Sequence, residues 1–277
     1  MNKISAAKIQ SVFLRAAVWL SAGVTVFALA GIIVYILCKG VPNLSLDLFS
    51  PKYSSENVSL FPALVNTVTM TLTALLAAVP LGVFSAVYLV EYANRGNKFV
   101  TLIGVTAETL SGIPSIVYGL FGYLLFVAKL KWGYSMMAGA LTLAIMILPL
   151  VMRTTEEALR SVPDSYREGS FGLGAGKLRT VFKIVLPSAV PGISAGIILA
   201  IGRIVGETAA LIFTAGTVAQ IPKNLMGSGR TLAIHLYALW NEGLEADKSY
   251  ATAVVLLVVV VLINAASSFA AKKLTKQ

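Results

Sequence analysis

The chain has 277 residues, of which 57% are hydrophobic and only 12% are charged, and its formal net charge is +10. Soluble globular domains contain about 25% charged residues. This composition therefore excludes an ordinary soluble domain and indicates an integral membrane protein. The single cysteine cannot form an internal disulfide, so no disulfide is expected to stabilise the fold.

Six segments are long enough to cross a bilayer, which requires about 20 predominantly apolar residues per helix. The first has a longer apolar run than the 7–15 residues of a signal peptide, and no cleavage site follows it, so it is expected to be retained. The sequence therefore predicts one all-α transmembrane domain over residues 1–277. Its spans are Ala17–Leu37, Leu64–Val90, Thr101–Ala128, Tyr134–Met152, Val190–Ala215 and Ala251–Ala271.

Basic residues are distributed unequally between the two sides of the predicted bundle. Fourteen Lys and Arg residues lie in the N-terminus, Ala93–Lys98, Arg153–Ala189 and the tail after Ala271, and seven lie in the other loops. Because basic loops stay on the inner side of a membrane, both termini are predicted to be cytoplasmic in a bacterial inner membrane. This asymmetry and binding to anionic lipid account for the net charge, so no nucleic-acid partner is expected.

The third span contains the sequence IPSIVYG, with Pro114 followed by Ser115. A proline inside a helix removes a backbone hydrogen bond and either kinks the helix or breaks it. Both outcomes are open here, and a break would free backbone groups beside a cavity. Glu108 lies one to two turns inside the same span. It can snorkel, pair with a basic residue or line the inner mouth of a path.

A glycine-rich stretch, GLGAGK, lies between the fourth and fifth spans. In a phosphate-binding loop, four residues separate the first glycine from a Gly-Lys pair, and Ser or Thr follows that pair. Here three residues separate Gly172 from Gly176, and Leu178 replaces the hydroxyl residue. A dinucleotide-binding pattern also fails, because its third glycine is missing. The stretch is therefore not expected to bind a nucleotide.

The spacing of this region matches a different signature. Five residues separate Glu168 from Gly174, and nine separate Gly174 from Ile184. This order resembles the EAA signature of ABC-transporter permease subunits, with Gly169 and Ser170 in place of two alanines. The matching residues are Glu168, Gly169, Gly174, Ile184, Leu186 and Pro187.

The resemblance implies a type I ABC importer permease-like bundle in which residues 153–189 form a cytoplasmic coupling loop. In that family a short helix and turn in this loop dock onto a separate ATPase subunit, which binds ATP and Mg²⁺. Glycines such as Gly174 permit a sharp turn with positive φ. The basic residues of the loop are expected to be solvated or to face lipid headgroups; they include Arg167, Lys177, Arg179 and Lys183. The alternative is a chance resemblance of a basic, glycine-containing loop.

The fifth span carries Arg203 and Glu207, one helical turn apart. A helix over Val190–Ala215 would place both on one small, polar face, opposite a face of isoleucines. An arginine at the centre of a span costs about 2.5–3.5 kcal/mol, so Arg203 is expected to face a partner or a water-filled cavity. One reading is an intrahelical salt bridge. The other is an anion site, in which Arg203 donates a fork of hydrogen bonds and Glu207 accepts one from a protonated phosphate oxygen.

The outer loop Gly216–Tyr250 contains Leu232, Leu236, Leu239 and Trp240 at helical spacing. This pattern predicts a short amphipathic helix of about ten residues, too short to span the membrane. His235, the single histidine, lies within it and is expected at a surface or interface. With one histidine and no metal-ligand cluster, the chain is predicted to bind no metal and to break no bonds itself.

The stretches GRIVGETAALIFTA and IPSIVYGLFG resemble the PstA family of bacterial phosphate-importer permeases, whose relative PstC shares the G-R-x-x-G-E-T core. The resemblance covers nearly the whole chain. It places Arg203, Glu207, Thr208, Pro114 and Ser115 along the substrate path. It also implies a PstC-like second permease, two PstB-like ATPase subunits and an external PstS-like phosphate-binding protein. Alternating access is the implied mechanism, and a sulfate or molybdate permease, a passive anion channel and an intramembrane enzyme are the alternatives.

Overall fold

The computed structural model describes residues 2–94, 96, 98–243 and 246–275, and these are helical apart from connecting loops. Arg95 and Lys276, two of the basic residues that predict the orientation, lie outside the described residues. The α-helices are α1 (Asn2–Gly40), α2 (Phe61–Val87), α3 (Lys98–Ser111), α4 (Ser115–Gly122), α5 (Met136–Arg160), α6 (Asp164–Gly172), α7 (Lys177–Thr180), α8 (Leu186–Val205), α9 (Ala209–Ile212), α10 (Leu232–Glu242) and α11 (Ala246–Thr275).

Short tighter or wider helical turns extend these helices. Two 3₁₀ turns, η1 (Val41–Asn43) and η2 (Leu46–Phe49), follow α1, whereas η3 (Tyr88–Tyr92), η4 (Tyr123–Lys129) and η5 (Val181–Val185) are π-helical. Each π-helical turn directly continues a longer helix. The second, third and fifth spans therefore each contain one.

The predicted all-α bundle with six spans is confirmed. Five single helical stretches, beginning at Gln10, Phe61, Met136, Lys177 and Ala246, are long and apolar enough to cross a membrane. The third span is a bent pair, Val100–Ser111 and Ser115–Lys129, with an angle of 103° between its halves. The break lies at Gly112–Pro114, so the proline interrupts the helix instead of merely kinking it.

The fifth span differs from the prediction of one helix over Val190–Ala215. Its helix begins earlier, at Lys177, and ends at Val205, and the short helix α9 follows after Gly206, Glu207 and Thr208. Gly206 has a low helix propensity, and Thr208 leaves the helical region with φ −125° and ψ −53°. The helix of the fourth span continues to Arg160, and that of the fifth span begins at Lys177. The connection between them is therefore shorter than the predicted loop 153–189.

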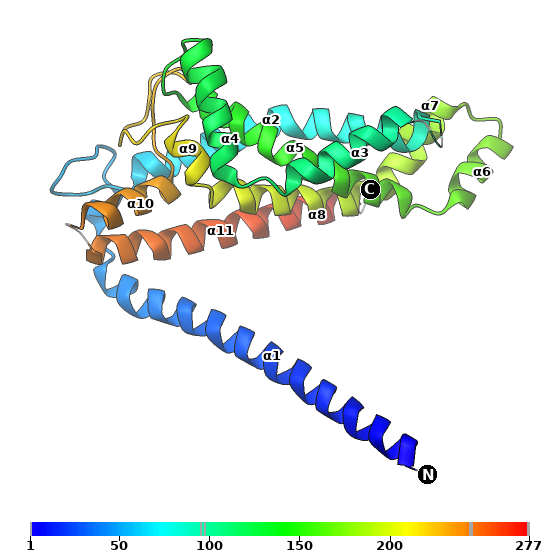
Figure 1. The fold of residues 1–277 in the computed structure, drawn as a ribbon. Helices are drawn as coiled ribbons and strands as arrows, with labels where there is room; N and C mark the ends of the chain where they lie inside the picture. The colour runs from blue at the N-terminus through cyan, green and yellow to red at the C-terminus, as the bar shows by residue number, and fades with distance from the viewer. Residues whose placement is uncertain (1, 95, 97, 244–245, 276–277) are drawn as a thin grey trace.

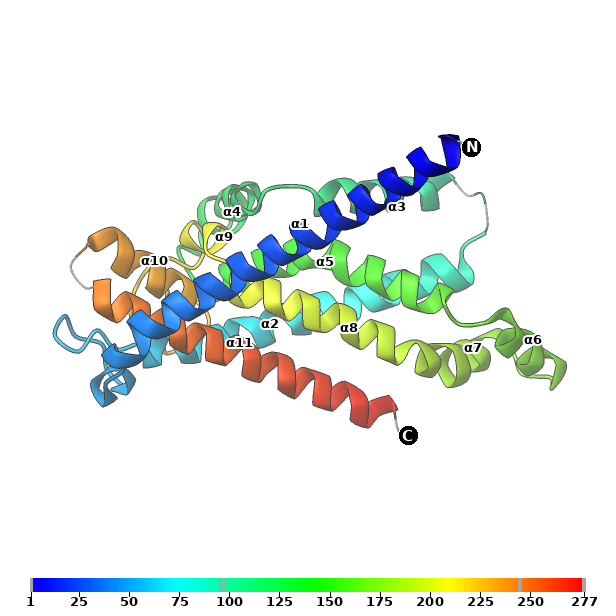
Figure 2. The same ribbon diagram turned by 90° about the horizontal axis from the view of Figure 1, so that it is seen from below.

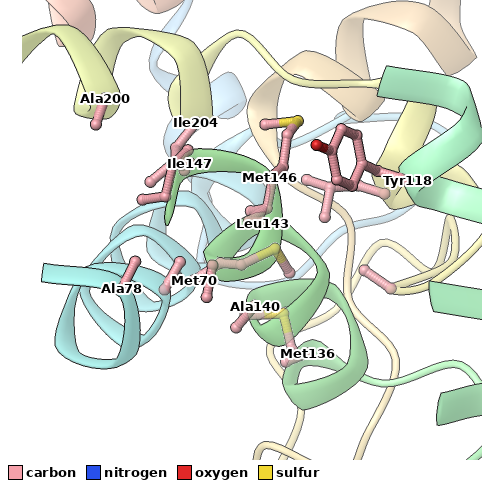
Figure 3. Close-up of a cluster of buried hydrophobic side chains, with 14 of the residues drawn as sticks. Met70, Ala78, Tyr118, Met136, Ala140, Leu143, Met146, Ile147, Ala200 and Ile204 are labelled. Atoms are coloured by element: carbon pink, nitrogen blue, oxygen red, sulfur yellow. The ribbon is translucent and has the colours of Figure 1, made fainter. Parts of the chain in front are cut away.

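The main core lies where α2, α4, α5 and α8 meet (Figure 3). Met146 and Ile147 of α5 pack there beside Tyr118 of α4 and Ile204 of α8. Glycines allow α4 to approach its neighbours closely: a Cβ at Gly122 would lie 2.1 Å from Thr142 Oγ1, and one at Gly119 would lie 2.8 Å from Ala210 Cα. Small residues at helix contacts are typical of membrane bundles.

The bundle has two distinct ends, seen in Figures 1 and 2. One end carries α10, and the opposite end carries α6 together with both chain termini. Helix α1 meets the bundle near η1 and α11 and then diverges from it, so the apolar side chains along its length are exposed. Both termini and α6 thus share one end, as the distribution of basic residues predicts.

Candidate substrate path and coupling surface

Arg203 lies in the last turn of α8 and lines an open recess of about 610 Å³, which we call the Arg203 recess. Its side chain is half-buried, and no described residue forms an ion pair or hydrogen bond with its guanidinium. A guanidinium in a membrane-spanning segment without a protein partner needs water or an anion as its partner. The recess is lined by Leu150, Ala195, Ile198, Leu199, Gly202, Arg203 and Asn264.

Asn264 of α11 is a recess residue that the sequence reasoning missed. Its Oδ1 atom is buried and has no hydrogen-bond partner among the described residues. The signal was present, because Asn264 is a single amide in the long apolar run of the sixth span. A polar side chain at membrane depth is costly and commonly functional. The recess therefore combines a cationic fork with an amide.

Glu207 and Arg203 do not form the intrahelical salt bridge that is one of the two readings of the sequence. The helix ends between the two residues, and Glu207 Oε1 accepts a hydrogen bond from the Ala210 N–H at 3.1 Å. The carboxylate thus caps the first turn of α9, where unpaired N–H groups favour a negative charge. Glu207 is 9% exposed, and its Oε2 atom has no hydrogen-bond partner among the described residues. That oxygen keeps the capacity to accept a hydrogen bond, but Glu207 is not among the residues that line the Arg203 recess.

Both predicted faces of the fifth span are packed in part. Gly196 and Ala200 are buried like Ile201 and Ile204, and a Cβ on Gly196 would clash with Thr154 of α5. The isoleucine face therefore packs against neighbouring helices, and the small residues of the opposite face are buried as well. Arg203 lies on the more open side, with the exposed residue Leu199.

The other residues predicted along the path do not line the Arg203 recess. Pro114 is exposed at the start of α4, and Ser115 is the first residue of that helix. Thr208 lines a separate pocket of about 400 Å³, whose other lining residues include Trp240 and Tyr250. Among the described residues, then, the structure does not gather these three side chains around Arg203.

Glu108 of α3 adopts one of the three roles that the sequence leaves open. Its Oε1 lies 3.5 Å from Nη1 of Arg153 on α5, and both side chains are largely exposed. Solvent screens exposed ion pairs and makes them contribute little to stability, so this pair is a weak link between α3 and α5.

The residues that match the EAA signature form α6, a turn and the start of the fifth span. Glu168 and Gly169 are exposed on α6, and Gly174 occupies the turn with φ +81°. Ile184 lies in η5, and Leu186 and Pro187 begin α8. Residues 164–180, from α6 to α7, are called the coupling segment below. It presents an apolar surface at the end of the bundle, and Leu173 at its tip is 91% exposed.

Arg167 is not solvated as predicted. Its side chain is 16% exposed and forms an ion pair with Glu91 of η3, with Nη2 2.7 Å from Oε1. Lys177 is exposed, but its ammonium lies 5.1 Å from the centre of the Tyr92 ring, within the range of a cation–π contact. Both residues therefore attach the coupling segment to the end of the second span.

The short helix predicted in the outer loop is confirmed as α10, whereas the surface position predicted for His235 is wrong. His235 is 0% exposed, and neither ring nitrogen has a hydrogen-bond partner among the described residues. Its ring lies edge-on to Tyr53, and Arg230 lies over the same tyrosine ring. Burial, assisted by the charge of Arg230, lowers the pKa of His235 from 6.5 to about 3.

The low pKa of His235 should make the free energy of unfolding depend on pH. Between pH 6.5 and about 3 the unfolded chain binds a proton at His235 that the folded chain does not, so stability falls as the pH decreases through this window. The slope approaches about 1.4 kcal/mol per pH unit. The Tm of the purified protein, measured by thermal unfolding, should fall as the pH is lowered from about 7 to about 5. His235→Phe should flatten that dependence, and an equal slope in both proteins would contradict the prediction.

Together, six spans, an exposed segment that matches the EAA signature and a guanidinium in the fifth span without a partner among the described residues indicate a polytopic membrane transport subunit. The model of the family "Binding-protein-dependent transport system inner membrane component" matches residues 78–276. The chain belongs to this family. It is accordingly a multi-pass inner-membrane permease subunit of an ABC transporter and not an enzyme, and ATP hydrolysis lies with partner subunits in such systems.

Curated relatives are similar over most of their length. The chain is 37% identical over 243 residues to the probable ABC transporter permease protein YqgI of Bacillus subtilis, covering 82% of each chain. It is 36% identical to the phosphate transport system permease protein PstA of Pasteurella multocida, covering 84% of this chain and 85% of the relative. It is 39% identical to the phosphate transport system permease protein PstA 1 of Mycobacterium tuberculosis, covering 75% of this chain and 69% of the relative.

Solved structures show the same fold at low sequence identity. A bacterial alginate ABC transporter, crystallised with an alginate pentasaccharide-bound periplasmic protein, matches with a TM-score of 0.69 at 16% identity over 98% of both chains. An inward-facing MetNI methionine ABC transporter matches with a TM-score of 0.61 at 20% identity, covering 88% of this chain and 98% of the other. The fold is therefore that of type I ABC importer permeases, and the expected bundle is confirmed. Such neighbours imply ATPase and substrate-binding protein partners.

Proposed function

We propose that the chain is the permease subunit of an ATP-driven inorganic phosphate importer and forms half of its translocation path. The named phosphate permeases among its relatives support the substrate. The observation that carries the site is the guanidinium of Arg203, which lines an open recess without a partner among the described residues. Arginine presents a rigid fork of donors that matches a tetrahedral oxyanion.

In this proposal, the recess opens on the side of the chain where a PstC-like second permease completes it. Two PstB-like ATPase subunits, which bind ATP and Mg²⁺, dock on the coupling segment, and a PstS-like protein delivers phosphate at the opposite end. The charge distribution supports a cytoplasmic position for both termini and for α6. ATP binding would close the ATPase subunits and open the recess outward, and hydrolysis would reverse this change. Phosphate must bind the two states with different affinities, because equal affinities shift neither.

Glu207 supplies a basis for choosing phosphate over sulfate. At neutral pH, phosphate retains a protonated oxygen that can donate a hydrogen bond, whereas sulfate is fully ionised. Glu207 Oε2 has no described partner and can accept that bond, while Oε1 remains on the Ala210 N–H. A charge-assisted hydrogen bond is worth about 1.5–3 kcal/mol, enough for roughly tenfold or greater discrimination.

A competition assay tests this assignment. The complex, purified through a tag on this chain and reconstituted with its binding protein, should take up labelled phosphate with little inhibition by excess sulfate. Glu207→Gln should reduce the preference about tenfold, since an amide is a weaker acceptor than a carboxylate. The unmodified and the Glu207→Gln complexes are assayed with the same binding protein. Glu157→Gln, which removes a charge from an exposed residue of α5, is the control. Equal competition by sulfate and phosphate in the unmodified complex would contradict the proposal.

A further inference from the structure

The coupling segment is held to the bundle mainly by polar contacts. Within the described chain, α6 buries a single side chain, that of Ser170, so apolar packing contributes little to its attachment. Ser170 Oγ lies 2.8 Å from Thr180 Oγ1 in a buried hydrogen bond, which joins α6 to α7. The coupling segment is thus linked across its own turn, and its position on the bundle must come from other residues.

Arg167 holds the coupling segment in place because its side chain connects α6 to η3 and to the end of α5. Nη2 and Nε donate to Glu91 Oε1 of η3 at 2.7 and 3.2 Å. Nη2 also donates to the Leu159 carbonyl at 3.0 Å, and Nη1 donates to the Val162 carbonyl at 2.8 Å. Leu159 lies in the last turn of α5, where helix carbonyls lack intrahelical partners, and Val162 follows two residues after the helix ends. One side chain therefore fixes α6 to the ends of both the second and the fourth spans.

The Glu91–Arg167 pair differs from the other described ion pairs of the chain. The Glu91 and Arg167 side chains are 8% and 16% exposed, whereas each of the other pairs includes a side chain that is more than half exposed. Removing one partner of a buried pair leaves an uncompensated charge, which is far more costly than losing an exposed pair. Glu91 and Arg167 therefore have to move together whenever α6 moves.

Helix α2 continues this connection to the opposite end of the bundle. Asn66 Nδ2 in its first turns donates to the Gln220 and Arg230 carbonyls at 2.8 and 3.1 Å, and Thr67 Oγ1 accepts the Leu232 N–H at 2.8 Å. The outer loop before α10 is thereby attached to α2. A single helix, extended by η3, joins the coupling segment at one end to the outer loop at the other (Figure 1).

We propose that Glu91 is a positioning residue through which the coupling segment moves the second span, so that the Glu91–Arg167 pair transmits ATPase motion to the outer loop. The inference rests on the proposed docking of an ATPase on the coupling segment. The neighbouring Lys177–Tyr92 contact supports the same link, since it joins α7 to the adjacent residue of η3. Glu91 itself need not touch substrate or nucleotide for this role.

The test is Glu91→Gln in the reconstituted complex, which removes the charge and keeps the shape. The ATPase should still co-purify with the chain, and basal ATP hydrolysis should stay within about twofold, whereas phosphate uptake should fall at least about tenfold. Glu157→Gln, at an exposed pair on α5, should leave all three measurements unchanged. Unchanged uptake in Glu91→Gln would overturn the proposal. Loss of the docked ATPase would also overturn it, because the pair would then only support docking.

A second experiment monitors the conformation of the outer loop directly. Cys38 is the single cysteine of the chain, so Val218→Cys in a Cys38→Ser background gives one reporter in the outer loop, at an exposed position. Its labelling by a membrane-impermeant thiol reagent should change on ATP binding, and Glu91→Gln should abolish the change. An equal change in both proteins contradicts transmission through Glu91. If the parent complex neither retains an ATPase nor takes up phosphate with ATP, the proposed function fails instead.

Discussion

Replacing Arg203 by alanine is expected to reduce ATP-driven phosphate uptake at least about 100-fold while leaving the complex assembled. Arg203 lines the recess with no hydrogen-bond or ion-pair partner among the described residues, so its loss removes donors to the substrate without breaking such a bond within the protein. Two charge-assisted hydrogen bonds are worth about 3 kcal/mol or more, and each 1.4 kcal/mol corresponds to a tenfold change. Uptake of labelled phosphate by reconstituted vesicles measures the effect.

Two further variants separate charge from geometry. Arg203→Lys retains a positive charge but loses the planar fork, so it should give intermediate uptake. Arg15→Ala removes the same side chain from an exposed position on α1 and should change nothing. Full uptake by Arg203→Ala would exclude the Arg203 recess from the path.

Changing Gly174 to alanine is expected to weaken ATPase docking about 5- to 30-fold. Gly174 has φ +81°, and an L-residue in this region costs roughly 1–2 kcal/mol. The turn also depends on local hydrogen bonds, including one from the Gly174 N–H to the Phe171 carbonyl at 2.9 Å. Co-purification of the ATPase at increasing detergent or salt measures docking.

Gly172 provides the matched control for this substitution. A Cβ at either glycine would meet nothing within 4 Å, but Gly172 lies in α6 without a positive φ. Gly172→Ala should therefore leave docking intact. Equal effects of the two substitutions would show that space at the ATPase surface, and not the turn, decides docking.

The spans and the class of fold follow from the sequence because long apolar runs leave few alternatives in a membrane. The break after Val205 could not be predicted in the same way. Arg203, Glu207 and Ala210 recur at helical spacing, and the break at Gly206–Thr208 is accompanied by a bond from the Ala210 N–H to the Glu207 carboxylate. Such a local contact competes with the helix only once tertiary packing fixes it.

The misplacement of Arg167 and His235 has a related cause. Each is a polar residue in a loop region, where solvent exposure is the usual outcome. Their burial depends on residues distant in sequence: Arg167 pairs with Glu91, and His235 packs against Tyr53. Asn264 enters the candidate site in the same manner, because the packing of α11 on α8 brings it beside Arg203. One sequence without structure does not specify these contacts.

The central claim is ATP-powered entry of phosphate through this chain and its partners. The most direct measurement compares uptake of labelled phosphate by vesicles containing the purified complex, supplied with ATP or with a non-hydrolysable analogue on the ATPase side. Phosphate should accumulate against its gradient with ATP and should not accumulate with the analogue. Equal uptake under both conditions, as a passive anion channel would give, would contradict the central claim.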